Sequence, residues 1–319
     1  MKPKFLWITD PWETLDHPKD TTLRLIEESI ALGFENYWCD LKTIRLMNHQ
    51  VLLDACLVKS VNSGRVSMDF KRGLPSPMKP SKFSRILYRP DPPVDQAYLH
   101  PLQLLVLGAP DSEIVANPEV LFASNEKTAG ALLPGLTPPS AVSSRWDYLS
   151  AFGLSERETI LKPLHQAQST GIALLNWTSE TEIKKSKAIL DVVTAHFQTP
   201  VILQKFLPEI SKGEQRLWFL NGKLLAVARK KPKSGEVVIN MDQGGTLVRT
   251  KLNARETKQA AKIGKVLRNQ KIRLAAVDLI AGFVTDFNFT SPGLLVQMEV
   301  LLEKNLARPI IKSLAAGWR

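Results

Sequence analysis

Asp278, Asp286 and Asn288 have residue types and a spacing that suit a divalent cation. They lie in two apolar runs, residues 275–280 and 283–289, and such runs separated by a glycine-containing turn predict a β-hairpin. Two carboxylates and an amide oxygen on one face of this hairpin would form a hard oxygen site, which suits Mg²⁺ that carries nucleotide phosphates. The alternative interpretation is a hairpin whose polar face is simply solvated.

The length of the hairpin loop decides between these interpretations. Side chains alternate between the two faces of a strand, and a three-residue loop over 281–283 would pair Ile280 with Val284. Asp278 and Asp286 would then share a face, with Asn288 next along it and Val284 on the same face of its strand. A two-residue loop would place Asp278 on the opposite face and would break the site.

Two lysines upstream could face phosphates if the fold brings them to this hairpin. Lys162 is expected at the end of a strand that begins near residue 159, and a polar loop, His165–Gly171, follows it. Lys127 is expected in a helix with Ser124 as its N-cap. Without further context, each lysine could equally be an ordinary surface residue.

The N-terminal third has the element order of a parallel α/β sheet. Residues 5–9 read as a strand, residues 21–33 as an amphipathic helix that ends at a glycine, and residues 35–41 as a second strand. A later strand ends at Arg89. Loops at the carboxyl ends of parallel strands are where such sheets bind ligands, so Arg89 is a candidate binding residue.

Charge is unevenly distributed along the chain. The net charge is +11, and residues 205–273 contain 17 Lys and Arg against 5 Asp and Glu. A basic segment of this size attracts nucleotides, acidic substrates or nucleic acid. Nucleic acid is the disfavoured partner, because the sequence has no zinc spacing, helix-turn-helix turn or aromatic RNA-binding signature.

The composition is that of an ordinary soluble globular protein rather than a membrane or secreted protein. Hydrophobic residues make up 44% of the 319 residues, and no apolar stretch reaches the roughly 18 residues of a membrane span. Charges occur too early for a signal peptide. The two cysteines, Cys39 and Cys56, form neither a disulfide framework nor a metal spacing. We therefore expect a cytoplasmic location and no membrane partner.

Several motifs together resemble the prokaryotic glutathione synthetase family of the ATP-grasp superfamily. The resemblance covers nearly the whole chain and is specific in the order and spacing of its motifs rather than in any single one. The motifs are DPWETLDHPKDTTLRLIEESIALGFE, RPDPPVD, NPEVLFASNEKTAGALL, ILKPL, LQKFLPEISKGEQR, LLAVAR and VDLIAGFVTDFNFTSPG.

This resemblance implies a fold and an activity. The expected fold is an ATP-grasp fold preceded by a parallel-sheet, Rossmann-like N-terminal domain. The expected domains are residues 1–124 for the N-terminal substrate domain, 125–200 for the small ATP-grasp subdomain and 201–319 for the C-terminal subdomain with the metal site. The expected activity is an ATP- and Mg²⁺-dependent carboxylate–amine ligase, with Mn²⁺ as a substitute metal. It would join a γ-glutamylcysteine-like carboxylate to a glycine-like amine through an acyl phosphate.

The resemblance also assigns expected roles to individual residues. Lys127 and Lys162 match phosphate-facing lysines, the main chain at Lys205 and Leu207 matches an adenine-contacting segment, and Glu214 matches a ribose-binding acid. The remaining matches are the metal ligands Asp278, Asp286 and Asn288, the catalytic arginines Arg216 and Arg229, and the peptide-substrate positions Arg89, Asn240, Gly244 and Gly245.

The chain departs from the family pattern at three loops. HQAQSTG replaces a glycine-rich phosphate-covering loop, an arginine before Asn240 is absent, and Pro90 replaces a lysine. Asp286 also replaces a glutamate. These departures leave open a catalytically impaired relative that only binds nucleotides or peptides. Small peptide and amino-acid substrates are the expected partners, and a homo-oligomer is compatible with the sequence.

Overall fold

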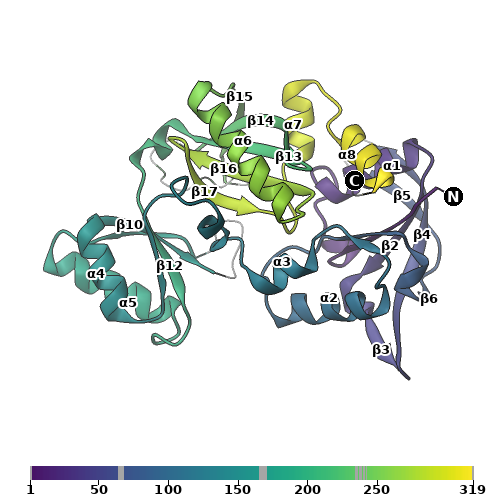
Figure 1. Ribbon diagram of the computed structural model, residues 1–319, viewed down its shortest axis with the longest axis horizontal. Helices are drawn as coiled ribbons and strands as arrows, with labels where there is room; N and C mark the ends of the chain where they lie inside the picture. Colours follow the sequence, from purple (N-terminus) through teal and green to yellow (C-terminus); the bar gives the residue numbers. More distant parts are fainter. Residues whose placement is uncertain are drawn as a thin grey trace.

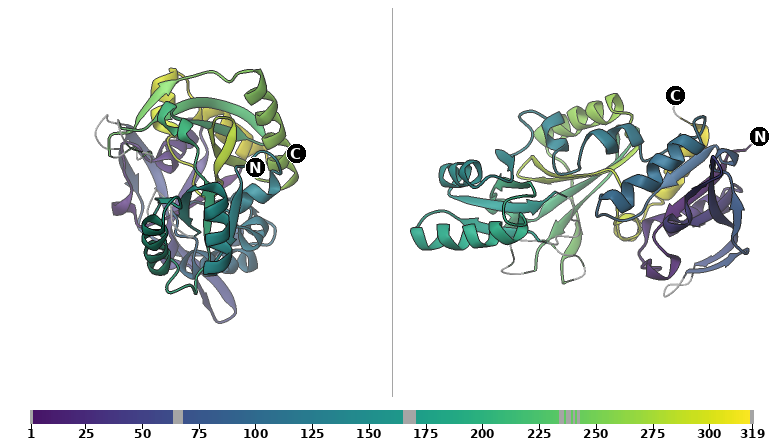
Figure 2. Two further views of the ribbon diagram at one scale, coloured as in Figure 1. Left: turned by 90° about the vertical axis from the view of Figure 1, so that its left-hand side faces the viewer. Right: turned by 90° about the horizontal axis from the view of Figure 1, so that it is seen from below.

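The computed structural model describes residues 2–63, 68–164, 171–233, 236, 239, 241 and 243–317. Across these residues the chain forms three sheets, arranged from one end of the molecule to the other (Figure 1). The eight-stranded sheet lies at the end that carries the N-terminus, the five-stranded sheet lies in the middle, and the four-stranded sheet forms the opposite end (Figure 2).

The N-terminal sheet has the strand order β3-β4-β2-β1-β7-β8, with β5 and β6 paired to β4. β1 pairs in parallel with β2 and with β7, whereas β2 and β4 are antiparallel, so the sheet is mixed around a parallel centre. Its strands are β1 Lys4–Thr9, β2 Glu35–Asp40, β3 Arg45–Met47, β4 Gln50–Ser63, β5 Met68–Arg72, β6 Ser76–Met78, β7 Arg85–Tyr88 and β8 Glu113–Ile114.

Helices and short turns connect these strands. In α1, the Asp20 carboxylate accepts a hydrogen bond from the backbone N–H of Leu23, which satisfies one of the free donors at the helix start. The helical segments are η1 Trp12–Thr14, α1 Thr21–Ala31, η2 Leu41–Thr43, η3 Pro80–Lys82, α2 Gln96–Gly108 and α3 Pro118–Ala123. The predicted strand–helix–strand start of the chain is therefore present.

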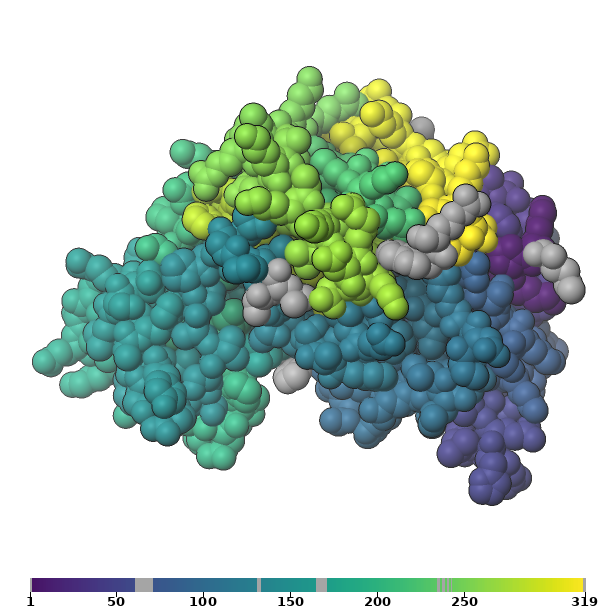
Figure 3. Space-filling view, in the orientation of Figure 1, coloured from purple at the N-terminus to yellow at the C-terminus, as the bar shows by residue number. Residues whose placement is uncertain are grey.

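The four-stranded sheet builds a lobe with its own small core. The strand order is β11-β10-β12-β9, all antiparallel, and two helices cover one face. The elements are β9 Ser140–Ser143, α4 Trp146–Glu156, β10 Glu158–Pro163, β11 Ala173–Asn176, α5 Glu180–Val193 and β12 Val201–Lys205. Leu149, Leu161, Trp177 and Leu203 belong to a cluster drawn from this lobe alone, and Figure 3 shows the lobe at one end of the surface.

The five-stranded sheet has the order β15-β14-β13-β16-β17 and is antiparallel throughout. Helix α6 packs across it so closely that a Cβ on Gly222 would lie 2.2 Å from the carbonyl oxygen of Gly264. The elements are η4 Ala129–Leu132, η5 Pro208–Lys212, β13 Glu214–Leu220, β14 Lys223–Lys231, β15 Thr246–Arg249, α6 Ala254–Asn269, β16 Leu274–Ile280, β17 Phe283–Asn288, α7 Leu295–Leu302 and α8 Ala307–Ala316.

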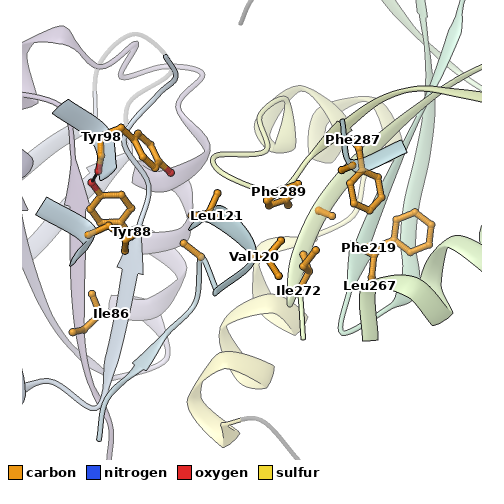
Figure 4. Packing of buried hydrophobic residues seen from close by; sticks show 14 of the residues in the cluster. Ile86, Tyr88, Tyr98, Val120, Leu121, Phe219, Leu267, Ile272, Phe287 and Phe289 are labelled. Atoms are coloured by element: carbon orange, nitrogen blue, oxygen red, sulfur yellow. Dashed lines mark hydrogen bonds between the residues drawn. The ribbon is translucent and has the colours of Figure 1, made fainter. Parts of the chain in front are cut away.

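Two hydrophobic clusters join the N-terminal sheet to the five-stranded sheet. One includes Tyr88 and Tyr98 on the N-terminal side, Val120 of α3 in the middle, and Phe287 and Phe289 beyond it (Figure 4). The other packs α8 and α7 against α1 and β1. The N-terminal sheet and the five-stranded sheet therefore share a continuous core. The domain boundaries after residues 124 and 200 remain a prediction. No helix among the described residues is long and apolar enough to span a membrane.

Candidate active site

A cavity of about 620 Å³ lies where the three sheets meet. Its walls come from the ends of β10 and β12, from one face of the five-stranded sheet, and from the loops that precede α1 and follow β7. It gathers most of the predicted site residues, namely Arg89, Lys127, Lys162, Lys205, Leu207, Glu214, Arg216, Asp278, Asp286 and Asn288.

The hairpin of β16 and β17 differs from the prediction in its turn but brings the two aspartates together. The loop has two residues, 281–282, both with positive φ, so Ile280 pairs with Phe283. The predicted three-residue loop is therefore wrong. A register shift follows at once, and it restores Asp278 and Asp286 as direct partners across the strands.

The same shift changes which side chains face the cavity. Val284 does not share the face of Asp286 as predicted; it is buried in the hydrophobic cluster with Phe287. Thr285 lines the cavity instead, together with Asp286. One extra residue in β17 thus buries two apolar side chains and keeps the carboxylates on the cavity side.

Asp278 is the most enclosed acid of the cavity, with 1% of its surface exposed. Arg216 binds it through two hydrogen bonds of 2.8 and 2.6 Å, and the Lys230 ammonium lies 2.8 Å from Oδ2. Burial by itself would raise the pKa of Asp278, but these two cations hold the pKa well below its ordinary value. The carboxylate is therefore ionised at neutral pH.

Asp286 and Asn288 lie on β17 next to Asp278 of β16, and these three cavity residues are called the acidic row below. The Lys127 ammonium lies 2.6 Å from Asp286 Oδ1, and Lys127 and Lys162 outweigh burial to lower the pKa of Asp286. The Asn288 amide donates to the backbone oxygen of Ala276, which leaves its own oxygen for another partner. Among the described residues, no three His, Cys, Asp or Glu side chains cluster as a metal site.

Lys127 reaches Asp286 from a turn rather than from the predicted helix. Ser124 is the residue that ends α3, and residues 125–128 form a turn stabilised by the side chain of Asn125. The predicted helix with Ser124 as its N-cap is therefore wrong. The neighbouring Glu126 fixes this turn, because its carboxylate accepts hydrogen bonds from the backbone N–H groups of Phe289 and Thr290.

Lys162 stands at the end of β10, as predicted, and reaches across the cavity to the opposite sheet. Its ammonium donates to the backbone oxygen of Thr285 at 2.6 Å and to Gln204 Oε1 at 3.1 Å. Burial lowers the pKa of Lys162 and the neighbouring Lys127 adds to this effect, although Asp286, Glu214 and Asp278 oppose it. This lysine connects the four-stranded lobe to the acidic row.

Glu214 and a group of apolar side chains lie on the side of the cavity that faces the four-stranded lobe. Glu214 accepts a hydrogen bond from the Thr285 hydroxyl at 2.9 Å and lies 3.0 Å from the Lys230 ammonium. Lys205 and Leu207 line the cavity where β12 leaves its sheet. The apolar side chains beside them are Ile160, Ile172, Phe206, Ile210, Ile239, Met241 and Ile280.

The opposite end of the cavity contains Arg89 and several polar groups. Arg89 is buried and donates to the Thr22 hydroxyl at 2.8 Å and to the backbone oxygen of Pro292 at 3.1 Å. Ser291 Oγ and Gln297 Oε1 are buried here, without a hydrogen-bond partner among the described residues. Burial raises the pKa of Asp20, which also lines this end.

Three predicted site residues do not line the cavity, and a fourth lies outside the described residues. Arg229 lies on the opposite face of β14 and donates to the backbone oxygen of Lys212 at 3.3 Å. Gly244 and Gly245 precede β15 and do not line the cavity. Asn240 lies outside the described residues, as do residues 165–170 of the small loop.

Lys230 and Glu126 are cavity residues that sequence reasoning missed. Lys230 follows the predicted Arg229 on β14, and because neighbours on a strand face opposite ways, only one of the two can enter the cavity. The pairing of Lys230 with Glu214 across the strands would have identified it. No local signal distinguishes Glu126 from a surface acid.

Comparison with known proteins agrees with this geometry. The ATP-grasp domain of prokaryotic glutathione synthetase matches residues 126–303, and the N-terminal domain of the same family matches residues 4–121. A glutathione synthetase of Prochlorococcus marinus (strain MIT 9313) is 31% identical over 310 residues, which is 97% of each chain. One from Synechocystis sp. is 27% identical over 316 residues, which is 97% of this chain and 98% of the relative.

Solved structures share the fold at lower identity. The crystal structure of D-cycloserine synthetase superposes with a TM-score of 0.71 at 15% identity and covers 98% of this chain and 99% of that chain. The ATP-grasp ligase PsnB, complexed with a phosphomimetic variant of its minimal precursor, Mg and ADP, gives a TM-score of 0.62 at 14% identity, with 99% of each chain covered. These likenesses establish the ATP-grasp fold.

Three observations agree with one another. The family models match both halves of the chain, and a relative is more than 30% identical along nearly its full length. The cavity also contains the lysines and carboxylates that the resemblance predicts. The chain belongs to the prokaryotic glutathione synthetase family, and it is a glutathione synthetase-like ATP-grasp ligase that forms carbon–nitrogen bonds.

Proposed function

We propose that the protein uses ATP and Mg²⁺ to join a γ-glutamylcysteine-like carboxylate to a glycine-like amine through an acyl phosphate. The observation that carries this proposal is the convergence of Lys127, Lys162, Asp278, Asp286 and Asn288 on one cavity. Side chains from two sheets and from the turn after α3 supply opposite charges within this space, as a reaction that moves a phosphoryl group requires.

The residues present fit a magnesium–nucleotide complex. Asp278, Asp286 and Asn288 offer two carboxylates and one amide oxygen, which are hard ligands, and the amide of Asn288 is already oriented by its bond to Ala276. Bound Mg²⁺ would neutralise phosphate charge and orient the phosphates. Mn²⁺ has similar ligand preferences and is the expected substitute.

The chain's own cations would hold the phosphates from two sides. Lys162 approaches from the four-stranded lobe and Lys127 from the turn after α3, while Arg216 lies on the floor of the cavity. Preorganised cations of this kind stabilise charge that develops on transferred oxygens without further rearrangement. We assign the ribose to Glu214, and the base to the main chain at Lys205 and Leu207 beside the apolar side chains, because all three residues line this part of the cavity.

The acyl substrate is assigned to the opposite end. Arg89 is the buried cation there, and an Arg fork suits a peptide carboxylate. Ser291 and Gln297 offer hydrogen-bonding atoms that have no partner in the described part of the chain. This arrangement leaves the reacting carboxylate between Arg89 and the phosphate cations.

The test is release of ADP and formation of an amide product. Purified protein with ATP, Mg²⁺, γ-glutamylcysteine and glycine should release ADP in proportion to tripeptide detected by mass spectrometry, and a panel of other amines would identify a different acceptor. Lys162→Met should lower kcat by about 10²–10³-fold, whereas Lys184→Met, an exposed lysine of the same lobe, should not. Nucleotide binding with no turnover on any amine would instead favour the catalytically impaired relative.

A further inference from the structure

Lys230 is a buried cation of the cavity, and the proposed function gives it no role. Only 6% of its surface is exposed, and its ammonium lies 2.8 Å from Asp278 Oδ2 and 3.0 Å from Glu214 Oε2. It therefore links the candidate metal ligand to the candidate ribose acid. The lysine ammonium and its carboxylate partners neutralise one another, because a buried charge without a partner would be strongly destabilising.

The candidate metal carboxylates are already neutralised by the protein. Asp278 is bound by Arg216 and Lys230, and Asp286 is bound by Lys127 at 2.6 Å. A divalent cation that enters alone must displace at least one ammonium group. The displaced ammonium would then lose a carboxylate partner inside a buried cavity, which is unfavourable.

Nucleotide phosphates would remove this obstacle. Four carboxylates and four cations line the end of the cavity nearest the acidic row, so their formal charges cancel; they are Glu126, Glu214, Asp278, Asp286, Lys127, Lys162, Arg216 and Lys230. A metal alone adds positive charge to this neutral, buried site, and a nucleotide alone adds negative charge. When both bind, each offsets the charge that the other brings.

We propose that Lys230 is a resident counter-ion that occupies the carboxylates of the metal site until nucleotide phosphates draw it, together with Lys127, away from them. Metal and nucleotide then bind cooperatively, and neither binds well alone. The proposal rests on the proposed function, since it takes the cavity to be a nucleotide site. By linkage, the factor by which nucleotide strengthens metal binding equals the factor by which metal strengthens nucleotide binding.

The first experiment measures metal binding without nucleotide, with Mn²⁺ as the probe and the electron paramagnetic resonance signal of free Mn²⁺ as the readout. Wild-type protein should bind Mn²⁺ weakly at the cavity. Lys230→Met should bind Mn²⁺ about tenfold more tightly, because it removes one of the two cations that hold Asp278 Oδ2 and also releases Glu214 Oε2. Lys231→Met is the matched control, since Lys231 is the next residue of β14, is exposed and faces away from the cavity.

A double variant tests where the gained metal binds. Lys230→Met combined with Asp278→Asn should lose the tenfold gain, because the gain depends on the freed carboxylate. Equal gains for Lys231→Met and Lys230→Met would show a general charge effect and would overturn the proposal. Lys230→Gln should reproduce the result if Lys230→Met fails to fold, and thermal unfolding of each variant identifies such a failure.

A calorimetric titration with a non-hydrolysable ATP analogue completes the test. Wild-type protein should bind the analogue about tenfold more tightly with Mn²⁺ present, and Lys230→Met should show a smaller ratio. Tight binding of Mn²⁺ by wild-type protein without nucleotide would overturn the counter-ion proposal and leave the ligase activity intact. Absence of nucleotide binding under all conditions would instead contradict the proposed function.

Discussion

The two ends of the cavity satisfy their polar groups in opposite ways. At the end near the acidic row, Asp278 and Asp286 are held by ammonium and guanidinium groups within 2.8 Å. At the Arg89 end, Ser291 Oγ and Gln297 Oε1 are buried without a hydrogen-bond partner among the described residues. The carboxylates of the first end are paired with the protein's own cations, whereas the second end has buried polar atoms that lack a partner among the described residues.

This difference indicates how each end gains affinity. At the acidic row, a ligand must exchange partners with groups that are already paired, so binding energy comes from the difference between two sets of ion pairs. At the Arg89 end, a polar ligand can add hydrogen bonds that the protein lacks. The acidic row should therefore matter for folding as much as for binding, whereas the other end should matter mainly for binding.

The largest expected effect is at Asp278. Asp278→Ala removes the shared partner of Arg216 and Lys230 and leaves two cations buried without it, which should lower the free energy of unfolding by about 3–5 kcal/mol. Urea-induced unfolding followed by circular dichroism measures this change. Asp147→Ala is the control, because Asp147 pairs with Arg145 on the surface, and exposed pairs contribute at most about 1 kcal/mol. Equal losses for the two variants would contradict the comparison.

The two ends should also respond to acid in opposite directions. The pKa of Asp278 is lowered in the fold, so its stabilising contribution is complete above its unfolded value of about 3.9 and is lost as the pH falls through the folded value. The pKa of Asp20 is raised by burial. Its ionised form therefore costs stability at neutral pH, and this cost disappears as the pH falls.

Paired variants test this difference. Asp20→Asn keeps an N-cap for α1 and should raise the free energy of unfolding at pH 7 by up to about 1 kcal/mol, with no effect at pH 3. Asp278→Asn should be destabilising at pH 7, with a penalty that shrinks as the pH is lowered from 5 to 3. Urea unfolding at several pH values provides the measurement. Parallel pH profiles for the two variants would contradict the expected difference between Asp20 and Asp278.

The smallest expected effect on stability is at Gln297. Gln297→Leu replaces a side chain whose buried oxygen has no partner in the part of the chain that the structure describes, so the free energy of unfolding should change by less than about 1 kcal/mol, while affinity for the acyl substrate should fall. Gln259→Leu is the matched comparison, because Gln259 donates to the backbone oxygen of Gly282 at 2.7 Å. Losing that bond should cost about 1–3 kcal/mol. A large penalty for Gln297→Leu would show that this end is already satisfied.

Local sequence patterns predicted most of the elements that position the site. The hairpin signal around residues 281–282 predicted the hairpin of β16 and β17, and the expected strand before Lys162 is β10. These signals are readable because turn and strand preferences depend on residues close together in the chain. The resemblance to a known family supplied the roles, which periodicity alone could not.

What local patterns missed depends on register. The two-residue loop of the last hairpin would separate Asp278 from Asp286, but the bulge at Thr285 restores their pairing, and only packing of Val284 and Phe287 in the core makes that bulge favourable. On β14, the choice between Arg229 and Lys230 follows from the pairing with β13. One residue of shift exchanges the faces of a strand.

The sequence by itself therefore determined most of the strands and helices, the family and most of the acidic and basic residues that meet in the cavity, because each of these is encoded by neighbouring residues or by motif order. The tertiary structure decided that Lys230 rather than Arg229 faces Asp278, that Lys127 reaches Asp286 from a turn, and that one end of the cavity is fully paired. These outcomes depend on contacts between residues tens to more than a hundred positions apart, which no local pattern contains.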